Sequence, residues 1–342
     1  MRRFLFLVLI GAASCIEPIN LKDAGAGGAL VVDGWVTDQP GPYIIKLSRT
    51  IPYNNSAPVK VYSVPERGAS VTIEDDLGNI SLLTETTEAG SYATSGLTGV
   101  VGRSYQLKFQ TSTGKKYAST IEKMPANPGL SAIKAEFQVS ETIFINANGS
   151  SRIQKKEDFG IYVIVNDPAA SENFYRWKAN GVYEFFSVTD FADRKQCWAP
   201  TLTRLESQLQ IASDTYFDGK EYKQFIGIFP YDRPTYYLLT VRQQSLTATA
   251  HSFLKRINIQ QTSTGTLFDP PATPISGNIK NLDGSETVLG FFSACSEVQS
   301  TLLVNRFVES GRVNPSRYTA PKNGDCRLHE VLATNIKWPG FP

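Results

Sequence analysis

The sequence of residues 69–86, ASVTIEDDLGNISLLTET, has the pattern of a β-hairpin. Two runs rich in β-branched and apolar residues, 69–74 and 80–86, flank the turn residues Asp75-Asp76-Leu77-Gly78-Asn79. Glycine and asparagine suit the backbone of tight turns, and Val, Ile and Thr favour strands. The stretch therefore predicts two antiparallel strands joined by a short turn.

The same alternation of strand-like runs and turns continues on both sides of this hairpin. Ser112-Thr113-Gly114 is a second tight turn. The expected strands are residues 29–37, 43–48, 69–74, 80–86, 91–94, 104–110 and 116–121. Seven short strands in about a hundred residues indicate a β-sandwich. We therefore expect residues 29–124 to form an immunoglobulin-like β-sandwich with a complete core of its own.

A break follows the seventh strand at residues 124–129, MPANPG, where two prolines and a glycine predict a domain boundary. Longer strand candidates follow at 159–165, 173–186, 225–229 and 235–243, and residues 288–295 and 301–308 resemble a closing hairpin. The stretch 190–222 and the tail from residue 314 are expected to be irregular. We expect residues 129–342 to form a larger β-rich C-terminal domain.

Only one stretch has the spacing of an amphipathic helix. Its apolar stripe consists of Leu246, Ala250, Phe253, Leu254 and Ile257. Ser245 or Thr247 is available as the N-cap, because a hydroxyl oxygen there accepts a hydrogen bond from a free backbone N–H group. One helix should therefore cover an end or a face of the sheet, in a chain whose fold class is all-β.

The N-terminus has the features of a bacterial lipoprotein signal peptide. Arg2 and Arg3 precede the apolar run 4–10, and small residues at 11–14 lead to Cys15. A membrane-spanning helix needs about 20 apolar residues, so this run is too short to be one. We expect residues 1–14 to be removed, Cys15 to carry lipid, and residues 15–28 to form a flexible tether. The alternative is an ordinary secretory signal with an incidental cysteine.

The charge balance argues against nucleic acid as a partner. The formal net charge is +2, and Arg2 and Arg3 of the signal account for that surplus. A protein that binds the phosphate backbone needs a basic patch, and none is evident along the chain. Attachment to a membrane would therefore depend on the lipid and not on charge.

Three cysteines remain besides Cys15, namely Cys197, Cys295 and Cys326. In an exported protein, one disulfide and one free thiol are the simplest arrangement. Cys295 lies in an apolar run that suits a buried thiol, whereas Cys197 and Cys326 have polar, turn-rich neighbours. Cys197 and Cys326 are therefore the better pair. A zinc site is disfavoured because the chain has no CxxC or paired-histidine spacing.

Catalytic and metal-binding motifs are not evident. The two histidines, His251 and His329, stand outside any nucleophile, metal or acid–base motif. The acidic turn at 75–79 lacks the distal bidentate glutamate of a calcium loop. The sequence thus predicts no metal, no cofactor and no catalytic residue, although an unmarked carboxylate pair for glycoside hydrolysis stays open.

The aromatic residues are candidates either for ligand stacking or for core packing. Trp35 is expected in the sandwich core and Trp198 against the disulfide, whereas Trp177 and Trp338 are less constrained. Stacking on a sugar or a peptide has candidates in Tyr222, Tyr231, Tyr236 and Tyr237.

Several blocks resemble the DUF4249 lipoproteins of Bacteroidota. They are residues 30–38 (LVVDGWVTD), 41–43 (GPY), 46–50 (KLSRT), 68–73 (GASVTI), 102–105 (GRSY), 268–271 (FDPP), 277–279 (GNI) and 288–292 (VLGFF). The resemblance covers nearly the whole chain. It implies an outer-membrane lipoprotein, commonly encoded beside a TonB-dependent receptor, in a family without an assigned activity.

These features together predict a non-enzymatic protein of the outer membrane, on either face of it. We expect a binding or assembly accessory of a TonB-dependent β-barrel transporter. The alternatives are a surface enzyme that acts on glycans and a structural or adhesion protein of the envelope.

Overall fold

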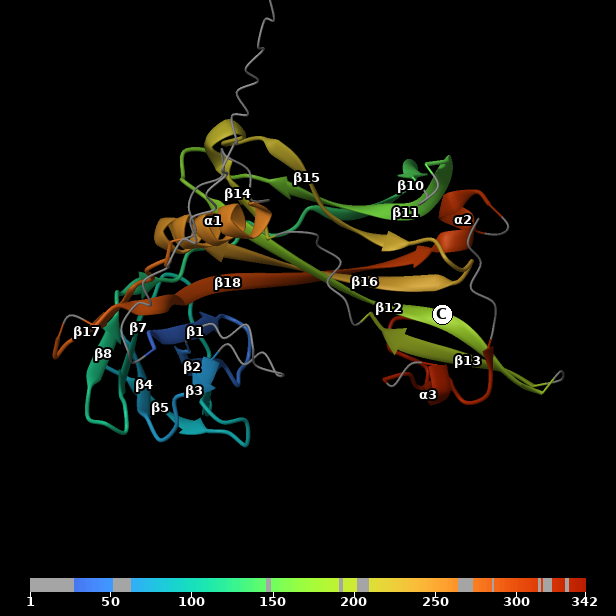
Figure 1. Ribbon diagram of the computed structural model, residues 1–342. Helices are drawn as coiled ribbons and strands as arrows, with labels where there is room; N and C mark the ends of the chain where they lie inside the picture. Colours follow the sequence, from blue (N-terminus) through green and yellow to red (C-terminus); the bar gives the residue numbers. More distant parts are fainter. Residues whose placement is uncertain are drawn as a thin grey trace, which may run out of the picture.

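A computed structural model describes residues 28–51, 63–145, 149–190, 193–201, 209–263, 273–284, 286–312, 315, 322–329 and 332–342. Long strands dominate this part of the chain, and its three α-helices are short (Figure 1). The prediction of an all-β fold is confirmed. Cys15, residues 1–14, most of the expected tether and residues 268–271 lie outside the described residues.

The N-terminal unit is a curled sheet around one apolar core, and every strand expected between residues 29 and 121 is present. Its strands are β1 (Leu30–Thr37), β2 (Ile44–Thr50), β3 (Ser63–Pro65), β4 (Ser70–Asp75), β5 (Ile80–Glu85), β6 (Ser91–Thr94), β7 (Ser104–Gln110), β8 (Lys116–Ser119) and β9 (Glu122–Lys123). Along β1, Leu30, Val32 and Val36 are fully buried, because every second side chain of a strand points to the same face.

The hairpin of residues 69–86 forms as predicted from β4 and β5, with Val71 opposite Leu83. The carboxylate of Asp75 accepts hydrogen bonds from the backbone N–H groups of Leu77 and Asn79, both at 2.9 Å. Gly78 has a φ of 82°, which only glycine adopts at little cost. Asp75 therefore shapes the turn itself, whereas the carboxylate of Asp76 binds Arg103.

Two C-terminal strands complete the N-terminal unit. β17 (Ile279–Asn281) pairs with β8, and the first half of β18 (Val288–Asn305) runs parallel to β1. The side chain of Asn278 closes the sheet, since it donates to the backbone oxygen of Phe292 at 2.8 Å and accepts from its N–H at 3.0 Å. The core of this unit contains Ile279, Val288, Phe292 and Ala294. The expectation that residues 29–124 hold a complete core is therefore wrong.

β18 passes without interruption from one unit to the other. Residues 288–295 pair with β1, and residues 296–305 pair with β16 (Tyr236–Leu246). The closing hairpin expected from residues 288–308 is thus one strand followed by the short helix α2 (Arg306–Ser310). The polar residues between Ser296 and Ser300 suggested a turn, but Ser296 is fully buried where the strand crosses between the units.

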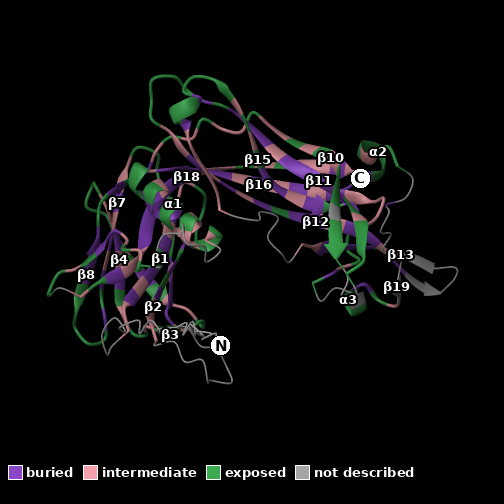
Figure 2. Cartoon of the chain, turned by 45° about the horizontal axis from the view of Figure 1, so that its top comes forward, coloured by how far each residue is buried: buried purple, intermediate pink, exposed green. Residues whose placement is uncertain are grey.

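The C-terminal unit packs two sheets face to face (Figures 1 and 2). A three-stranded sheet consists of β10 (Ala132–Ile145), β11 (Ser151–Asn166) and β15 (Glu221–Pro230). It covers β12 (Phe174–Asp190), β16 and β18. The core between them contains Phe159, Trp177, Phe229, Tyr231 and Tyr237, each at most 2 % exposed.

Several elements fall where the sequence predicted none. β10 was missed altogether, although its alternation is regular. The stretch expected to be irregular contains β13 (Asp193–Pro200), β14 (Gln210–Ser213) and the 3₁₀ helix η1 (Asp214–Tyr216). The tail contains β19 (Lys322–Asn323) and α3 (Cys326–His329).

The predicted amphipathic helix is α1 (Ala248–Thr262), and Thr247 is its N-cap, with its hydroxyl accepting from the N–H of Ala250. Ala250, Phe253 and Leu254 face Phe291 and Cys295 of β18. The helix therefore covers the junction between the two units. Among the residues that the structure describes, no helix is long and apolar enough to cross a membrane.

A disulfide joins Cys197 of β13 to Cys326 of α3, with 5.8 Å between the Cα atoms. This is the pair that the sequence context favours, and Cys295 is free and buried. Trp198 does not pack against this disulfide as expected. It packs with Val182 and Phe341, because neighbouring residues of a strand point to opposite faces.

Candidate functional site

The outer face of the β12–β16–β18 sheet presents a row of polar side chains. At one end α1 covers Phe174 and Leu246, and at the other Phe341 lies against Val182. Between these ends the strand register brings to one face Lys178, Asn180, Thr240, Arg242, Glu297, Gln299 and Thr301. We call these seven residues the saddle. Asn180, Gln299 and Thr301 are exposed, and the other four are half-buried.

Glu297 ties the saddle to the N-terminal unit. Its backbone N–H donates to the carboxylate of Asp38 at 2.7 Å, and its carbonyl oxygen accepts from the Gln39 amide at 2.8 Å. Its carboxylate accepts from the Gln244 amide at 2.8 Å and lies 3.7 Å from Arg242. Both units therefore fix the position of one saddle residue, and the saddle depends on their relative placement.

A tryptophan with two cations borders the saddle. The guanidinium carbon of Arg176 lies 5.0 Å from the ring centroid of Trp35, and the amine of Lys178 lies 5.8 Å from it. Trp35 is half-buried on the outer side of β1, so it is not the sandwich-core residue that the sequence predicted. Burial, together with the charge of Arg176, lowers the pKa of the Lys178 amine. A partly desolvated cation beside an aromatic ring is a typical recognition element.

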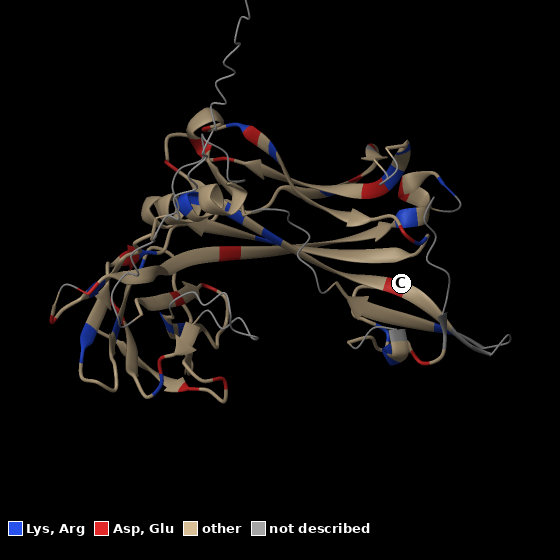
Figure 3. Cartoon of the chain, in the orientation of Figure 1, with Lys and Arg blue, Asp and Glu red and all other residues tan. Residues whose placement is uncertain are grey.

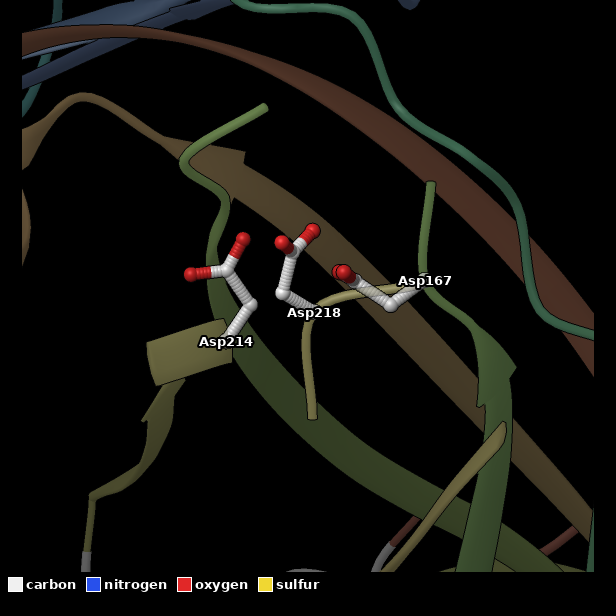
Figure 4. Close-up of side chains that lie close together, drawn as sticks. All are labelled: Asp167, Asp214 and Asp218. Carbon is white, nitrogen blue, oxygen red and sulfur yellow. The ribbon is translucent and has the colours of Figure 1, made fainter. Parts of the chain in front are cut away.

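Three carboxylates meet in a second cluster, formed by Asp167, Asp214 and Asp218 (Figure 4). One oxygen from each lies within 4.8 Å of the others. Asp167 follows β11, Asp214 begins η1, and Asp218 lies in the turn before β15. Asp167 and Asp214 are buried, whereas Asp218 is exposed.

Each carboxylate of this cluster already accepts a hydrogen bond. The phenol of Tyr175 donates to Asp167 at 2.5 Å, and burial together with that carboxylate raises the pKa of Tyr175, so the phenol stays protonated. The N–H of Asn173 donates to Asp214 at 2.7 Å, and the N–H of Ala170 donates to Asp218 at 2.9 Å. The cluster thus fastens the loop after β11 to η1. Its free lone pairs are of the kind that Ca²⁺ accepts as ligands.

Neither site could be recognised from the sequence. The three aspartates do not have the sequence spacing of a metal-binding motif, because separate turns of the chain bring them together. The saddle residues come from three strands whose register the sequence does not determine. The sequence showed that side chains alternate along these strands. It did not show which face of the sheet stays uncovered.

The other residues singled out in the sequence have structural roles. Tyr231 and Tyr237 are buried, and Trp177 is buried with its ring N–H bonded to Gln243 at 2.8 Å. Tyr222 stacks on Phe217 with ring centroids 3.9 Å apart. These contacts make the four residues parts of the core.

Tyr236 and Trp338 pack on the cluster around Trp198. His251 stacks on Phe174, and burial lowers the pKa of its imidazole. His329 ends α3. Burial raises the pKa of the Cys295 thiol to about 12, so this thiol is protonated at neutral pH. The saddle and the aspartate cluster therefore contain none of these candidates.

The blocks quoted from the sequence lie within a match to a protein family whose function is unknown. Residues 16–301 match the sequence profile described as "Domain of unknown function (DUF4249)". No curated protein matches the chain. The matched region includes all seven saddle residues. Since it spans well over half of the sequence, the chain belongs to the DUF4249 family.

Proposed function

We propose that this protein is a non-enzymatic binding or assembly accessory of a TonB-dependent β-barrel receptor, anchored in the outer membrane through lipid on Cys15. The observation that carries the proposal is the saddle. It is a polar, partly exposed sheet face whose Glu297 is hydrogen-bonded to both units. Such a surface suits a protein partner, since interfaces combine aromatic residues and arginine with hydrogen-bonding rims.

The saddle offers both hydrogen-bond donors and hydrogen-bond acceptors. Lys178 and Arg242 supply positive charge, Glu297 supplies negative charge, and Asn180 and Gln299 supply amides. Lysine, arginine, aspartate and glutamate are interspersed over both units, without one dominant sign (Figure 3). A partner would therefore recognise the saddle by its hydrogen-bond pattern more than by long-range attraction.

Co-purification from detergent-solubilised outer membrane tests this role. We expect the wild-type protein to bring down a β-barrel protein in stoichiometric amount. Thr301→Arg places a long cation on the exposed β18 edge of the saddle and should abolish that recovery. Thr84→Arg is the matched control, because Thr84 is also an exposed strand threonine but lies on β5. Equal recovery with both variants would refute the proposed role of the saddle.

The anchor has a test of its own. Cys15→Ala should leave the protein unlabelled by a fatty-acid probe and release it from the outer-membrane fraction, because stable attachment depends on acyl chains. A Cys15→Ala variant that is still labelled and still sediments with the outer membrane would exclude Cys15 as the lipid site.

A second candidate function is glycan cleavage, favoured by the aspartate cluster. Tyr216 lies two residues after Asp214 in η1 and is 92 % exposed, so its ring is available for stacking against a sugar ring. Most glycosidases use a pair of neighbouring carboxyl groups for catalysis. If the protein hydrolyses a glycan, Asp214→Asn should remove that turnover and Asp283→Asn, an exposed control, should not.

A further inference from the structure

The long β10–β11 hairpin carries exposed apolar side chains next to the residues that join its two strands, 146–150. Ile143, Phe144 and Ile145 are 67 %, 43 % and 77 % exposed, and Ile153, which pairs with Ile143, is 64 % exposed. We call Ile143, Phe144, Ile145, Arg152 and Ile153 the hairpin tip. Figure 1 shows that this tip lies at the end of the C-terminal unit away from the N-terminal unit.

The hairpin tip carries apolar side chains on both of its faces. The register puts Ile143 and Ile153 on the face that carries Phe137 and Phe159 further along the hairpin, and Phe144 points to the opposite face. A protein partner that docks against one side of a two-stranded ribbon would leave the other side in water. An apolar medium that surrounds the ribbon covers both sides at once.

Basic residues lie beside the apolar ones and further back along the hairpin: Arg152 pairs with Phe144, and Lys155 and Lys156 pair with Glu141 and Ser140. Arg152, Lys155 and Lys156 are exposed. Lys156 is ion-paired with the buried Asp158 at 3.2 Å, and Lys155 lies beside Glu141. The Arg152 guanidinium lies 5.8 Å from the Phe144 ring centroid. The ion pair between Lys155 and Glu141 is long, at 3.5 Å, and both side chains are more than half exposed, so it neutralises little charge. Cations at this depth complement the phosphates of anionic lipid headgroups.

A second element at the same end is also apolar. α2 lies near the end of β10 in Figures 1 and 2, and its Phe307 and Val308 are 44 % and 62 % exposed. This end of the C-terminal unit therefore presents apolar side chains from two elements, with cations around them.

From these observations we propose that the hairpin tip inserts into the interfacial region of an anionic lipid bilayer. Ile143, Phe144, Ile145 and Ile153 would lie among the upper acyl chains, and Arg152 and Lys155 would contact lipid phosphates. This contact is separate from the acyl anchor expected at Cys15. It requires no transporter, so it goes beyond the proposed function and can fail or succeed independently of it.

Vesicle sedimentation with the processed chain, residues 15–342 carrying Cys15→Ser, tests the proposal without an acyl chain. The protein should bind vesicles of phosphatidylethanolamine and phosphatidylglycerol, and bind vesicles of phosphatidylcholine alone more weakly. Ile143→Asp/Ile145→Asp should weaken binding to the anionic vesicles by about tenfold or more, because buried apolar area is lost. Both side chains are exposed, so the fold should not change.

Leu77→Asp is the matched control, because Leu77 is a 73 % exposed apolar residue at the tip of another hairpin. It should bind like the wild type. A tryptophan probe gives a second measurement: Ile145→Trp should gain fluorescence that lipids brominated on the upper acyl chain quench, and Leu77→Trp should not.

Three results would overturn the proposal. The first is vesicle binding that the double substitution leaves unchanged, and the second is an equal loss with Leu77→Asp. The third is an absence of vesicle binding while the double variant loses a co-purifying protein, which would make the hairpin tip a protein-docking surface instead.

Discussion

Glu122 is a buried carboxylate that links the N-terminal unit to α1. It is 2 % exposed and accepts hydrogen bonds from Thr247 at 2.6 Å, Thr249 at 3.1 Å and Asn278 at 3.2 Å. Thr247 is also the N-cap of α1, so the carboxylate lies at the positive end of that helix. Hydroxyl and amide donors together with the helix end replace the cation that a buried carboxylate normally requires.

Glu122→Ala should therefore destabilise the folded protein by about 2–3 kcal/mol, because it leaves buried donors without an acceptor. Urea denaturation of the full chain measures this free energy. Glu141→Ala is the control, since that glutamate is 53 % exposed on the β10–β11 hairpin, and it should leave the midpoint almost unchanged. Equal midpoints for the two variants would show that Glu122 does not link the two parts.

Glu286 gives the stability a defined pH dependence. Its own burial would raise its pKa, but hydrogen bonds from Lys115, Arg49 and Tyr117 outweigh that and lower the pKa to about 2. A depressed pKa in the folded state adds stability above the unfolded-state pKa of about 4.5, and this stability is lost as the pH falls toward 2. The free-energy difference between wild type and Glu286→Gln should be constant above about pH 5 and shrink between pH 4.5 and 2. A difference that does not change across that interval would contradict the interpretation.

At the scale of elements, the disulfide fixes the C-terminal residues to β13. The cross-link spans 129 residues of sequence, and the backbone of Trp198 pairs with Thr334 beside it. Because a long closed loop restricts the unfolded chain, the bond is worth roughly 4–5 kcal/mol in the chain-entropy model.

Cys326→Ser should lower the melting temperature and increase hydrogen exchange at Trp198 and Thr334, whose backbone groups bond to each other at 2.9 and 3.0 Å. Cys295→Ser is the control, because it removes a thiol without a cross-link and should leave exchange at these two amides unchanged. Unaltered exchange in Cys326→Ser would mean that packing of Phe341 and Trp338 alone secures this region.

The elements differ in how far the sequence predicts them. The hairpin of residues 69–86 and the N-cap at Thr247 depend on local chemistry, and both were predictable. β18 was not, because its polar middle resembles a turn unless its partners are known, and those partners are distant in sequence. β10 was missed for a related reason: its alternation is regular up to Val139, but the three consecutive apolar residues at 143–145 fit neither a strand with one buried face nor a turn. The saddle and the aspartate cluster likewise depend on register and on loop convergence.

At the scale of the whole molecule, β18 makes the two units one structure. Residues on both sides of the break at 124–129 share the core around Phe292, and Asn278 closes the N-terminal sheet from the C-terminal side. Substitutions in either unit should therefore affect the stability of both, and the saddle keeps its geometry because β18 runs through its edge.

The most direct test of this shared architecture is the unfolding of residues 29–124 expressed alone, followed by circular dichroism during heating and by amide resonance dispersion. The fragment lacks β17, β18 and the core side chains of Ile279, Val288 and Phe292. We expect no cooperative transition and poorly dispersed resonances. A cooperative transition with well-dispersed resonances would contradict the account, because it would show that the N-terminal unit needs no strand from the C-terminal part of the chain.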